Sequence, residues 1–269
     1  MGKKYNDFDI RMKSYEDKTK FMPQLPIIIR LDGRNFSKYT KGLDRPFDKR
    51  MSTVMIEVAK ALVEETNAVI SYTQSDEISL VLYTKSNKTQ VYFNGKEQKI
   101  VSSLSALASV LFNKLANKYM PLHNHYHMPT FDCRAFTVPT LIEATNQILW
   151  RERDATKNSI SMAAHDKFGH KKLMKKNSKE KKDMLMEAGV NWNNFPTFFK
   201  RGTFIQRKTV KAKLSRSDLD TLPTKHHAHL HPDKEIERIV IQEIDMPAFN
   251  KVSNRVEVIF EQAIPEQLC

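Results

Sequence analysis

The alternation of apolar and polar positions along the chain predicts strands and helices in a definite order. The apolar run Ile27–Leu31 is typical of a buried strand, and Val69–Thr73 and Ile78–Tyr83 predict two further strands joined by a tight turn. Between the first and second strands, apolar side chains recur at helical spacing from Asp48 to about Asn67. This spacing predicts an amphipathic helix, with Asp48 as its N-cap.

The pattern continues with a second helix over residues 100–119 and a strand over residues 131–138. A strand–helix–strand–strand order is half of a ferredoxin-like sheet, the layout also used by polymerase palms. We therefore predict an α+β fold, in which helices pack on a polymerase palm-like (ferredoxin-like) antiparallel sheet. Ahead of it, residues 8–21 predict a short surface helix.

The character of the sequence changes after about residue 140. A long helix is expected over residues 141–164, a strongly basic segment over 171–182 and a basic strand over 200–214; residues 215–234 resemble a loop, and 235–244 fit a strand or a short helix. We therefore expect a catalytic core in residues 1–140. Residues 141–269 would form a helical, basic C-terminal extension for RNA binding and oligomerisation, with one continuous domain as the alternative.

Composition narrows the class of partner. The 269 residues carry 44 Lys and Arg against 31 Asp and Glu, a net charge of +13, which favours a polyanion such as nucleic acid. No uncharged apolar run approaches the roughly 20 residues of a spanning helix, so no membrane partner is expected. The polar N-terminus and the two cysteines without a CxxC motif indicate a reduced, cytoplasmic protein.

Glycine is scarce, with seven in the chain, and neither a P-loop nor GxGxxG is present. A phosphate-rich ligand would therefore be neutralised by metal ions, Lys and Arg rather than wrapped by a glycine loop.

Carboxylates stand where the predicted strands end. Asp32 follows the first strand directly, and Asp76 and Glu77 occupy the turn between the second and third strands. Taken alone, Asp32 before Gly33 is equally compatible with an ordinary turn. Buried like charges need a cation to neutralise them, and carboxylate oxygens are ligands that Mg²⁺ prefers. Adjacent strands would therefore predict a site for two Mg²⁺ ions.

Four motifs carry a resemblance to a known family: Arg30-Leu31-Asp32-Gly33-Arg34-Asn35-Phe36, Gln74-Ser75-Asp76-Glu77, Phe131-Asp132-Cys133-Arg134 and Lys200-Arg201-Gly202-Thr203. In this order they resemble the tRNA-histidine guanylyltransferase family, over roughly residues 5 to 210. The resemblance implies a palm-like enzyme that adds nucleotides to the 5′ end of tRNA. It implies activation of that end with ATP, attack by the 3′-hydroxyl of GTP, and loss of pyrophosphate. It also suggests a homotetramer.

The resemblance further implies site residues. Asp32, the Gly33 carbonyl and Asp76 would be the metal ligands, and Glu77 a third catalytic carboxylate or an outer partner. Arg34 can offer a forked donor to phosphate. The residues expected to contact the nucleotide are Asp32, Gly33, Arg34, Asn35, Phe36, Ser37, Arg45, Ser75, Asp76 and Lys99, the last near the start of a predicted helix.

The basic segments 171–182 and 200–213 would follow RNA phosphates without reading sequence. The candidate RNA-binding residues are Asn158, Lys181, Lys182, Asn193, Lys200 and Arg201. Trp192 and Phe195 nearby would serve either the core or stacking, and the core is the commoner use of such aromatics.

Departures from the family pattern separate two branches. After Trp150-Arg151, Thr156 stands where the family has a histidine, although Asn158 matches; Ser37 likewise replaces a histidine. These departures favour the divergent branch that repairs truncated tRNA 5′ ends on a template. Two other classes stay open: a tRNA-binding module with decayed catalysis, and a palm-type nucleotide cyclase that needs no RNA.

Overall fold

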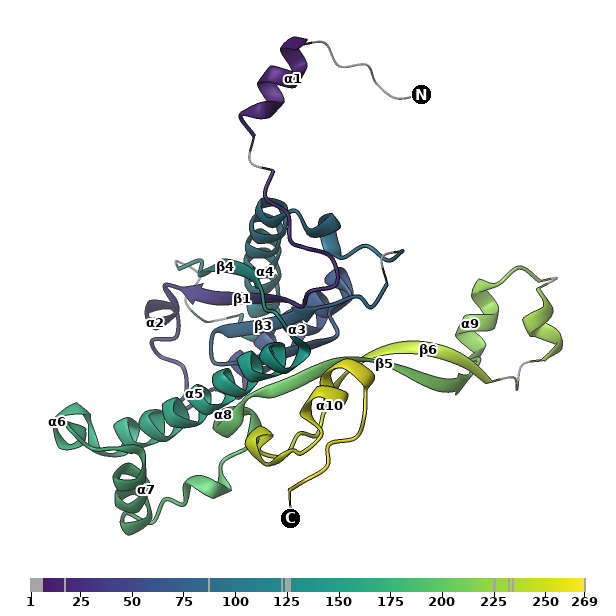
Figure 1. Ribbon diagram of the computed structural model, residues 1–269. Coiled ribbons are helices and arrows are strands. Elements are labelled where there is room, and N and C mark those ends of the chain that lie inside the picture. The colour runs from purple at the N-terminus through teal and green to yellow at the C-terminus, as the bar shows by residue number, and fades with distance from the viewer. Residues whose placement is uncertain are drawn as a thin grey trace.

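The computed structural model describes residues 7–16, 18–86, 88–121, 123, 127–224, 226–231, 233 and 235–268. At its centre is a sheet of six strands in the order β4-β1-β3-β2-β5-β6, with every neighbouring pair antiparallel (Figure 1). The strands are β1 (Ile27–Arg34), β2 (Ile70–Gln74), β3 (Glu77–Leu82), β4 (Thr130–Thr137), β5 (Thr203–Lys213) and β6 (Glu235–Ile244).

The first four strands have the ferredoxin-like order β4-β1-β3-β2, and the helices α3 (Lys49–Thr66) and α4 (Glu97–Tyr119) connect them. This arrangement confirms the predicted α+β, palm-like sheet. The N-cap of α3 is confirmed as well, because the Asp48 carboxylate accepts a hydrogen bond from Arg50 N at 2.8 Å.

Helices α3 and α4 cover one face of the sheet. By length and composition alone, α4 is apolar enough to cross a membrane. One stripe of this helix, with Ile100, Leu104 and Phe112, is fully buried in a core that includes Ile29 and Leu31 of β1. That packing is the one expected of a core helix in an α+β fold.

Helices α5 (Leu141–Phe168) and α10 (Arg255–Glu261) lie on the other face. Their core joins Ile28 and Tyr72 to Ile148 and Val258. Because β5 pairs with β2 and this core combines both halves of the chain, sheet and core run across residue 140. The arrangement fits the alternative of one continuous domain.

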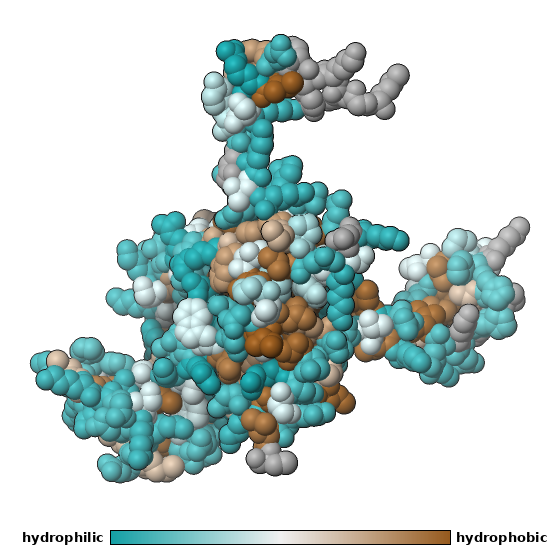
Figure 2. Space-filling model, viewed as in Figure 1, coloured by the Kyte–Doolittle hydropathy of each residue, from teal (hydrophilic) through white to brown (hydrophobic). Residues whose placement is uncertain are grey.

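Smaller elements surround the sheet. They are the helices α1 (Asp7–Ser14), α2 (Phe36–Tyr39), α6 (His170–Leu173), α7 (Ser178–Glu187), α8 (Thr197–Arg201) and α9 (Arg216–Thr221), and the 3₁₀ turns Tyr92–Gly95, Trp192–Asn194, His227–Leu230 and Phe249–Lys251. Figure 1 shows α1 standing apart from the sheet, and β5 and β6 running outward as a two-stranded ribbon. Figure 2 shows a largely hydrophilic surface on the lobe of α6 and α7.

Two local predictions need correction, and one open alternative is decided. The helix expected over residues 8–21 ends at Ser14, because Lys20 is extended and pairs with Lys96. Residues 215–234 are not only loop: a capping box between Ser215 and Asp218 starts α9. Of the two forms allowed for residues 235–244, the strand is correct, since it pairs with β5 along its whole length.

Candidate active site

The predicted carboxylates meet at one end of the sheet. Asp32, near the end of β1, lies opposite Glu77 of β3, and Ser75 and Asp76 form the two-residue turn between β2 and β3. The backbone N–H of Gly33 donates to the Asp76 carbonyl at 3.0 Å. This hydrogen bond fixes the turn against β1, so the structure brings Asp32, Gly33 and Asp76 together.

The backbone around these carboxylates includes left-handed residues that are not glycine. Ser75 has φ 55° and Asn35, just after β1, has φ 66°. A left-handed conformation costs most residues of order 1 kcal/mol, although asparagine tolerates it better. Ser75 therefore has a strained backbone within the turn. Burial raises the pKa of Asp76, and a hydrogen bond from the Ser75 hydroxyl offsets part of that rise.

Gly33 is required at its position by space. A Cβ added there would lie 2.4 Å from the Phe36 ring and 2.8 Å from Asp76 Cβ. Phe36 cannot yield readily, because it is buried and packs edge-on against Phe112 and Phe131. The predicted nucleotide-contacting Phe36 is thus a core residue whose ring also forms one wall of a cavity.

The ionised form of the Asp76 carboxyl is electrostatically unfavourable in this site. Its pKa lies above the ordinary value, first because of burial and then because the charges of Asp32 and Glu77 are close. In the folded protein, the ionised form of Asp76 is therefore destabilised until a cation approaches it.

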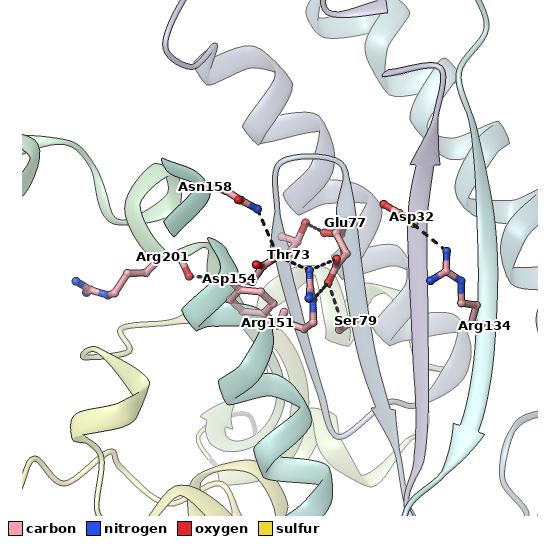
Figure 3. A network of polar contacts seen from close by, with 10 residues as sticks. Asp32, Thr73, Glu77, Ser79, Arg134, Arg151, Asp154, Asn158 and Arg201 are labelled. Atoms are coloured by element: carbon pink, nitrogen blue, oxygen red, sulfur yellow. Dashed lines mark hydrogen bonds and ion pairs between the residues drawn. The ribbon is translucent and has the colours of Figure 1, made fainter. Parts of the chain in front are cut away.

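Glu77 has a different role from the other two carboxylates. Arg151 of α5 holds it with a fork, in which Nε donates to Oε1 and Nη2 donates to Oε2, each at 2.6 Å (Figure 3). Arg151 also reaches Asp154 at 3.1 Å. Both oxygens of Glu77 are engaged by Arg151, as suits the predicted outer partner, whereas Asp32 and Asp76 line a cavity beside it.

The strand β4 adds two charged residues that sequence reasoning left out of the site. Asp132 lies directly opposite Asp32, and Arg134 Nη2 is 3.8 Å from Asp32 and 3.4 Å from Asp132. These three side chains are between 41% and 52% exposed. Their signal was the alternation in the motif Phe131-Asp132-Cys133-Arg134, which places Asp132 and Arg134 on one face of a strand.

Within the described residues, two cavities meet at Asp76. The first, here called the α3 pocket, has a volume of about 270 Å³ and lies between the segment after β1 and helix α3. Its apolar lining consists of Phe36, Leu43, Pro46, Phe47, Met51, Met162, Phe198 and Phe199. Its polar lining includes Ser37, Asp44, Arg45, Asp48, Ser75 and Asp76, so the predicted Ser37, Arg45 and Ser75 are all present.

The second cavity, here called the α5 pocket, measures about 430 Å³ and lies between the carboxylates and helix α5. Most of its lining is polar, and includes Asp32, Asp76, Arg151, Asn158, Ser161 and His165. Arg151, Ser161 and His165 were missed in the sequence because nothing local links α5 to the turn at Asp76.

Comparisons with known proteins identify the family. A family model described as tRNAHis guanylyltransferase matches residues 9–139, the part of the chain that holds Asp32 and Asp76. A Drosophila melanogaster protein named probable tRNA(His) guanylyltransferase is 30% identical over 74% of this chain and 73% of its own. The Saccharomyces cerevisiae tRNA(His) guanylyltransferase is 28% identical over 73% of this chain and 89% of its own. The chain belongs to the tRNA(His) guanylyltransferase family.

A solved structure agrees with this assignment. A bacterial tRNA(His) guanylyltransferase-like protein in complex with ATP is 38% identical, with a TM-score of 0.69 over 75% of this chain and 87% of its own. The same description in complex with GTP gives 30% identity and a TM-score of 0.69, over 91% of this chain and 95% of the other. The resemblance read from the motifs is thereby confirmed, and with it the class of enzyme, a nucleotidyltransferase.

The candidate RNA-binding residues of the present chain form two groups, and one residue belongs to neither. Asn158 lines the α5 pocket, and Lys181 Nζ donates to Ser161 of the same pocket at 3.0 Å. Lys182 and Lys200 lie over the Trp192 ring, 4.0 and 5.7 Å from its centroid. Asn193 joins this second group through its carbonyl, which accepts a hydrogen bond from Lys200 Nζ.

The exception is Arg201, which turns inward. Its Nε lies 3.7 Å from the buried carboxylate of Glu152, and its carbonyl accepts a hydrogen bond from the Tyr72 hydroxyl. Trp192 is buried, as the commoner use of such aromatics suggests. The pKa of Lys200 lies below its ordinary value, first because of burial and then because the charges of Arg201 and Lys182 are close.

Four predicted nucleotide contacts, Gly33, Arg34, Asn35 and Lys99, line neither pocket. Arg34 is exposed at the end of β1. Lys99 is remote: α4 contacts Phe131, the neighbour of Asp132, through Ser109, which accepts a hydrogen bond from Phe131 N at 2.9 Å. Lys99 stands ten residues earlier on the helix, about 15 Å along its axis. The structure therefore does not bring Lys99 to the carboxylates.

The residues at the site fit a hard cation. Asp32, Asp76 and the Gly33 carbonyl supply oxygen donors, the class that Mg²⁺ prefers, and Gly33 keeps the space above them free of a Cβ. Among the described residues, no cluster of three or more His, Cys, Asp or Glu side chains has metal-binding geometry. A site here therefore depends on the backbone carbonyl as its third protein ligand.

Proposed function

We propose that this protein is a 3′-to-5′ nucleotidyltransferase that adds nucleotides to the 5′ end of tRNA. The observation that carries the proposal is the shared wall, because Asp76 lines both the α3 pocket and the α5 pocket. Two substrates held in different cavities would meet at this carboxylate. Transfer between a nucleoside triphosphate and an RNA end requires that proximity.

The α3 pocket would bind the nucleoside triphosphate. Its apolar residues, among them Leu43, Phe47 and Met51, suit the flat face of a base, and its volume of about 270 Å³ suits a small ligand. Arg45 at the rim would pair with the triphosphate. ATP and GTP are the proposed substrates, in keeping with the complexes formed by the bacterial relatives.

The α5 pocket would receive the 5′ end of the RNA. Asn158 and Ser161 offer polar groups inside it, and Lys181 adds a cation at its edge. Arg151 holds Glu77 by its fork and so stabilises the turn that carries Asp76. The basic group of Lys182 and Lys200 would contact phosphates farther along the RNA.

Asp32, Asp76 and the Gly33 carbonyl would hold Mg²⁺, with two ions proposed. When bound, Mg²⁺ would neutralise phosphate charge and favour ionisation of the attacking 3′-hydroxyl. Asp76 itself gains from this neutralisation, since burial and its acidic neighbours raise its pKa. Asp32 of β1 and Asp76 of the β2–β3 turn would orient the phosphates through the bound cation. The Gly33–Asp76 hydrogen bond keeps this strand and this turn aligned.

Repair of truncated tRNA, rather than strict addition to histidine tRNA, is the proposed role within the family. Thr156 and Ser37 replace two family histidines, and the two bacterial structures described as guanylyltransferase-like are 38% and 30% identical, against 26% for the yeast structure.

The test is a transfer assay with ATP, GTP, Mg²⁺ and 5′-phosphorylated tRNA, either intact or lacking its first nucleotide. Wild type is expected to extend the shortened tRNA preferentially. Asp76→Asn should reduce product by about a thousandfold, a loss typical of removing a group that stabilises the reacting charges. Asp183→Asn, which changes an exposed carboxylate of α7, is the matched control and should retain activity.

Tight tRNA binding without product from wild type would contradict the proposal and indicate a binding module. A cyclic nucleotide formed from ATP or GTP without RNA would instead indicate a cyclase. Preference for intact histidine tRNA would leave the transferase standing and reject repair.

A further inference from the structure

Trp150 has no place in the core. The helix α5 buries residues such as Ile148, Leu149 and Glu152 on its inner side, whereas Trp150 is 51% exposed. The other tryptophan of the chain, Trp192, is 7% exposed. A large aromatic ring left in solvent loses much of the free energy that burial would provide, so its exposure calls for a ligand.

Two guanidinium groups lie against this ring. The Cζ atom of Arg30 is 5.5 Å from the ring centroid, and that of Arg151 is 4.6 Å from it. Arg30 belongs to β1, whereas Arg151 is the neighbour of Trp150 on α5 and is bonded to Glu77 of β3. With both cations in place Trp150 still keeps 51% of its surface exposed, and that part is open to a base.

Two arginines face each other near Trp150, and the carboxylates of Asp32 and Asp132 balance their charge only loosely. Arg30 lies directly opposite Arg134 across the β1–β4 ladder, so two like charges share one face of the sheet. Such pairs destabilise a sheet. Arg134 is 52% exposed, and its carboxylate contacts are no closer than 3.4 Å. A phosphate placed between Arg30 and Arg134 would turn this repulsion into attraction.

The surface is close to the reacting carboxylates. Arg30 and Asp32 are two residues apart on the same face of β1, about 7 Å along the strand. One nucleotide of single-stranded RNA has the dimensions to place its base on Trp150 and its phosphate at Arg30 while the next unit approaches Asp32.

We propose that Trp150, Arg30 and Arg134 form a binding site for one unpaired nucleotide of the RNA substrate. The base stacks on Trp150, and the phosphate pairs with the two arginines. Stacking of this kind tolerates any base, because every base has an aromatic face. The inference rests on the proposed RNA substrate and adds a place where its single-stranded end is held beside the site.

The first test uses fluorescence of the full chain carrying Trp192→Phe, in which Trp150 is the only tryptophan. Two hairpin RNAs serve as probes, one with a short single-stranded 3′ end and one blunt. The single-stranded hairpin is expected to quench Trp150 emission strongly and the blunt one weakly. Equal quenching by both hairpins would overturn the proposal, since the two share the same loop and the blunt one offers no unpaired base at its end.

The second test measures binding of the same hairpins. Trp150→Ala should weaken binding of the single-stranded hairpin by about tenfold, whereas Trp150→Phe should stay within about threefold of wild type because it keeps an aromatic face. Ile142→Ala removes another exposed apolar side chain from α5 and should change nothing. Binding by Trp150→Ala equal to wild type would overturn the proposal.

These outcomes separate the inference from the proposed function. If wild type extends tRNA but Trp150→Ala binds both hairpins normally, the stacking site is wrong and the transferase stands. If wild type extends no RNA, the transferase is wrong, and the fluorescence result still decides whether Trp150 binds an unpaired base.

Discussion

The two pockets share Gln74, Ser75, Asp76 and Met162, but the rest of each lining comes from different parts of the chain. The α3 pocket draws much of its lining from one continuous segment, residues 36–52, and its floor is apolar. The α5 pocket combines Asp32 of β1 with Arg151 and Asn158 of α5, and its lining is mostly polar. An apolar slot recognises a flat base by shape, whereas a polar cavity suits a charged, hydrated RNA end. This difference is the basis on which we propose one substrate for each pocket.

Each pocket also has its own arginine–carboxylate fork. In the α3 pocket, Arg50 binds Asp48 two residues away, and this hydrogen bond is the main reason why the pKa of Asp48 falls to about 2. In the α5 pocket, Arg151 binds Glu77 from 74 residues away. The first fork tightens a local loop, while the second joins a helix to the catalytic turn.

Gly33→Ala should impair both pockets at once, because Asp76 lines both and the new side chain would displace it. The new Cβ would meet Phe36 at 2.4 Å and Asp76 Cβ at 2.8 Å. We expect transfer to fall about a hundredfold through misplacement, with a loss of about 1–3 kcal/mol in the free energy of unfolding. Gly189→Ala, which meets open space at φ +77°, should cost stability through its backbone and leave transfer unchanged. Full activity in Gly33→Ala would contradict the packing argument.

Arg151→Lys should affect the α5 pocket alone. Lysine keeps the charge but cannot form the fork to Glu77, so α5 loses its link to β3, while the Gly33–Asp76 hydrogen bond still holds the turn. Transfer to tRNA should fall about tenfold, a loss of about 1.4 kcal/mol in transition-state stabilisation, with the KM for GTP unchanged. Steady-state kinetics measures both quantities. Lys85→Ala breaks an exposed ion pair with Glu261 and should change neither quantity. A raised KM for GTP in Arg151→Lys would show that the two pockets do not act separately.

Met51→Ala should affect the α3 pocket alone. Met51 lines that pocket and is 9% exposed, whereas Met55, one turn along α3, is buried and lines neither pocket. Both alanine variants should lose about 2–5 kcal/mol of stability. Only Met51→Ala should raise the KM for nucleotide, by about tenfold. A gel-shift assay with tRNA should give wild-type affinity for both, and equal KM values in the two variants would reject the base assignment.

Glu152→Gln should leave both pockets working and change only the pH dependence of stability. Burial raises the pKa of Glu152 to about 7, so the folded protein holds its proton more tightly than the unfolded chain does. As pH rises from about 4.5 through 7, the wild type should lose up to about 3 kcal/mol through this group, and stability should level off above that. Glutamine can still accept from Phe249 N and should remove this decline.

Urea unfolding of both proteins at intervals from pH 5 to pH 8 measures the difference. Transfer at pH 7 should agree within about twofold, since Glu152 lines neither the α3 pocket nor the α5 pocket. Parallel stability profiles would show that Glu152 titrates normally.

Local patterns in the sequence were enough to predict the sheet and its carboxylates. The apolar run ending at Asp32 and the two-residue turn at Asp76 are short-range features, and strand pairing alone brings them together. The same logic could have included Asp132, which pairs with Asp32 once β4 is placed beside β1.

Contacts over long sequence distances could not be predicted this way. The fork between Arg151 and Glu77 depends on how α5 crosses the sheet, which no local pattern specifies. Lys99 was expected at the triphosphate because it opens a helix, but the direction of α4 carries it to the far end. Arg201 was expected on RNA from its charge, yet the buried Glu152 draws it inward.

The most direct test of the two-pocket account is crosslinking on the unmodified protein with Mg²⁺ present. An azido-purine triphosphate and an RNA hairpin with 4-thiouridine at its 5′ end would be crosslinked separately, and the attached peptides identified by mass spectrometry. The account predicts that the nucleotide attaches within residues 36–52 and the RNA within residues 151–165. Attachment of both probes to the same peptide, or the reverse assignment, would contradict it.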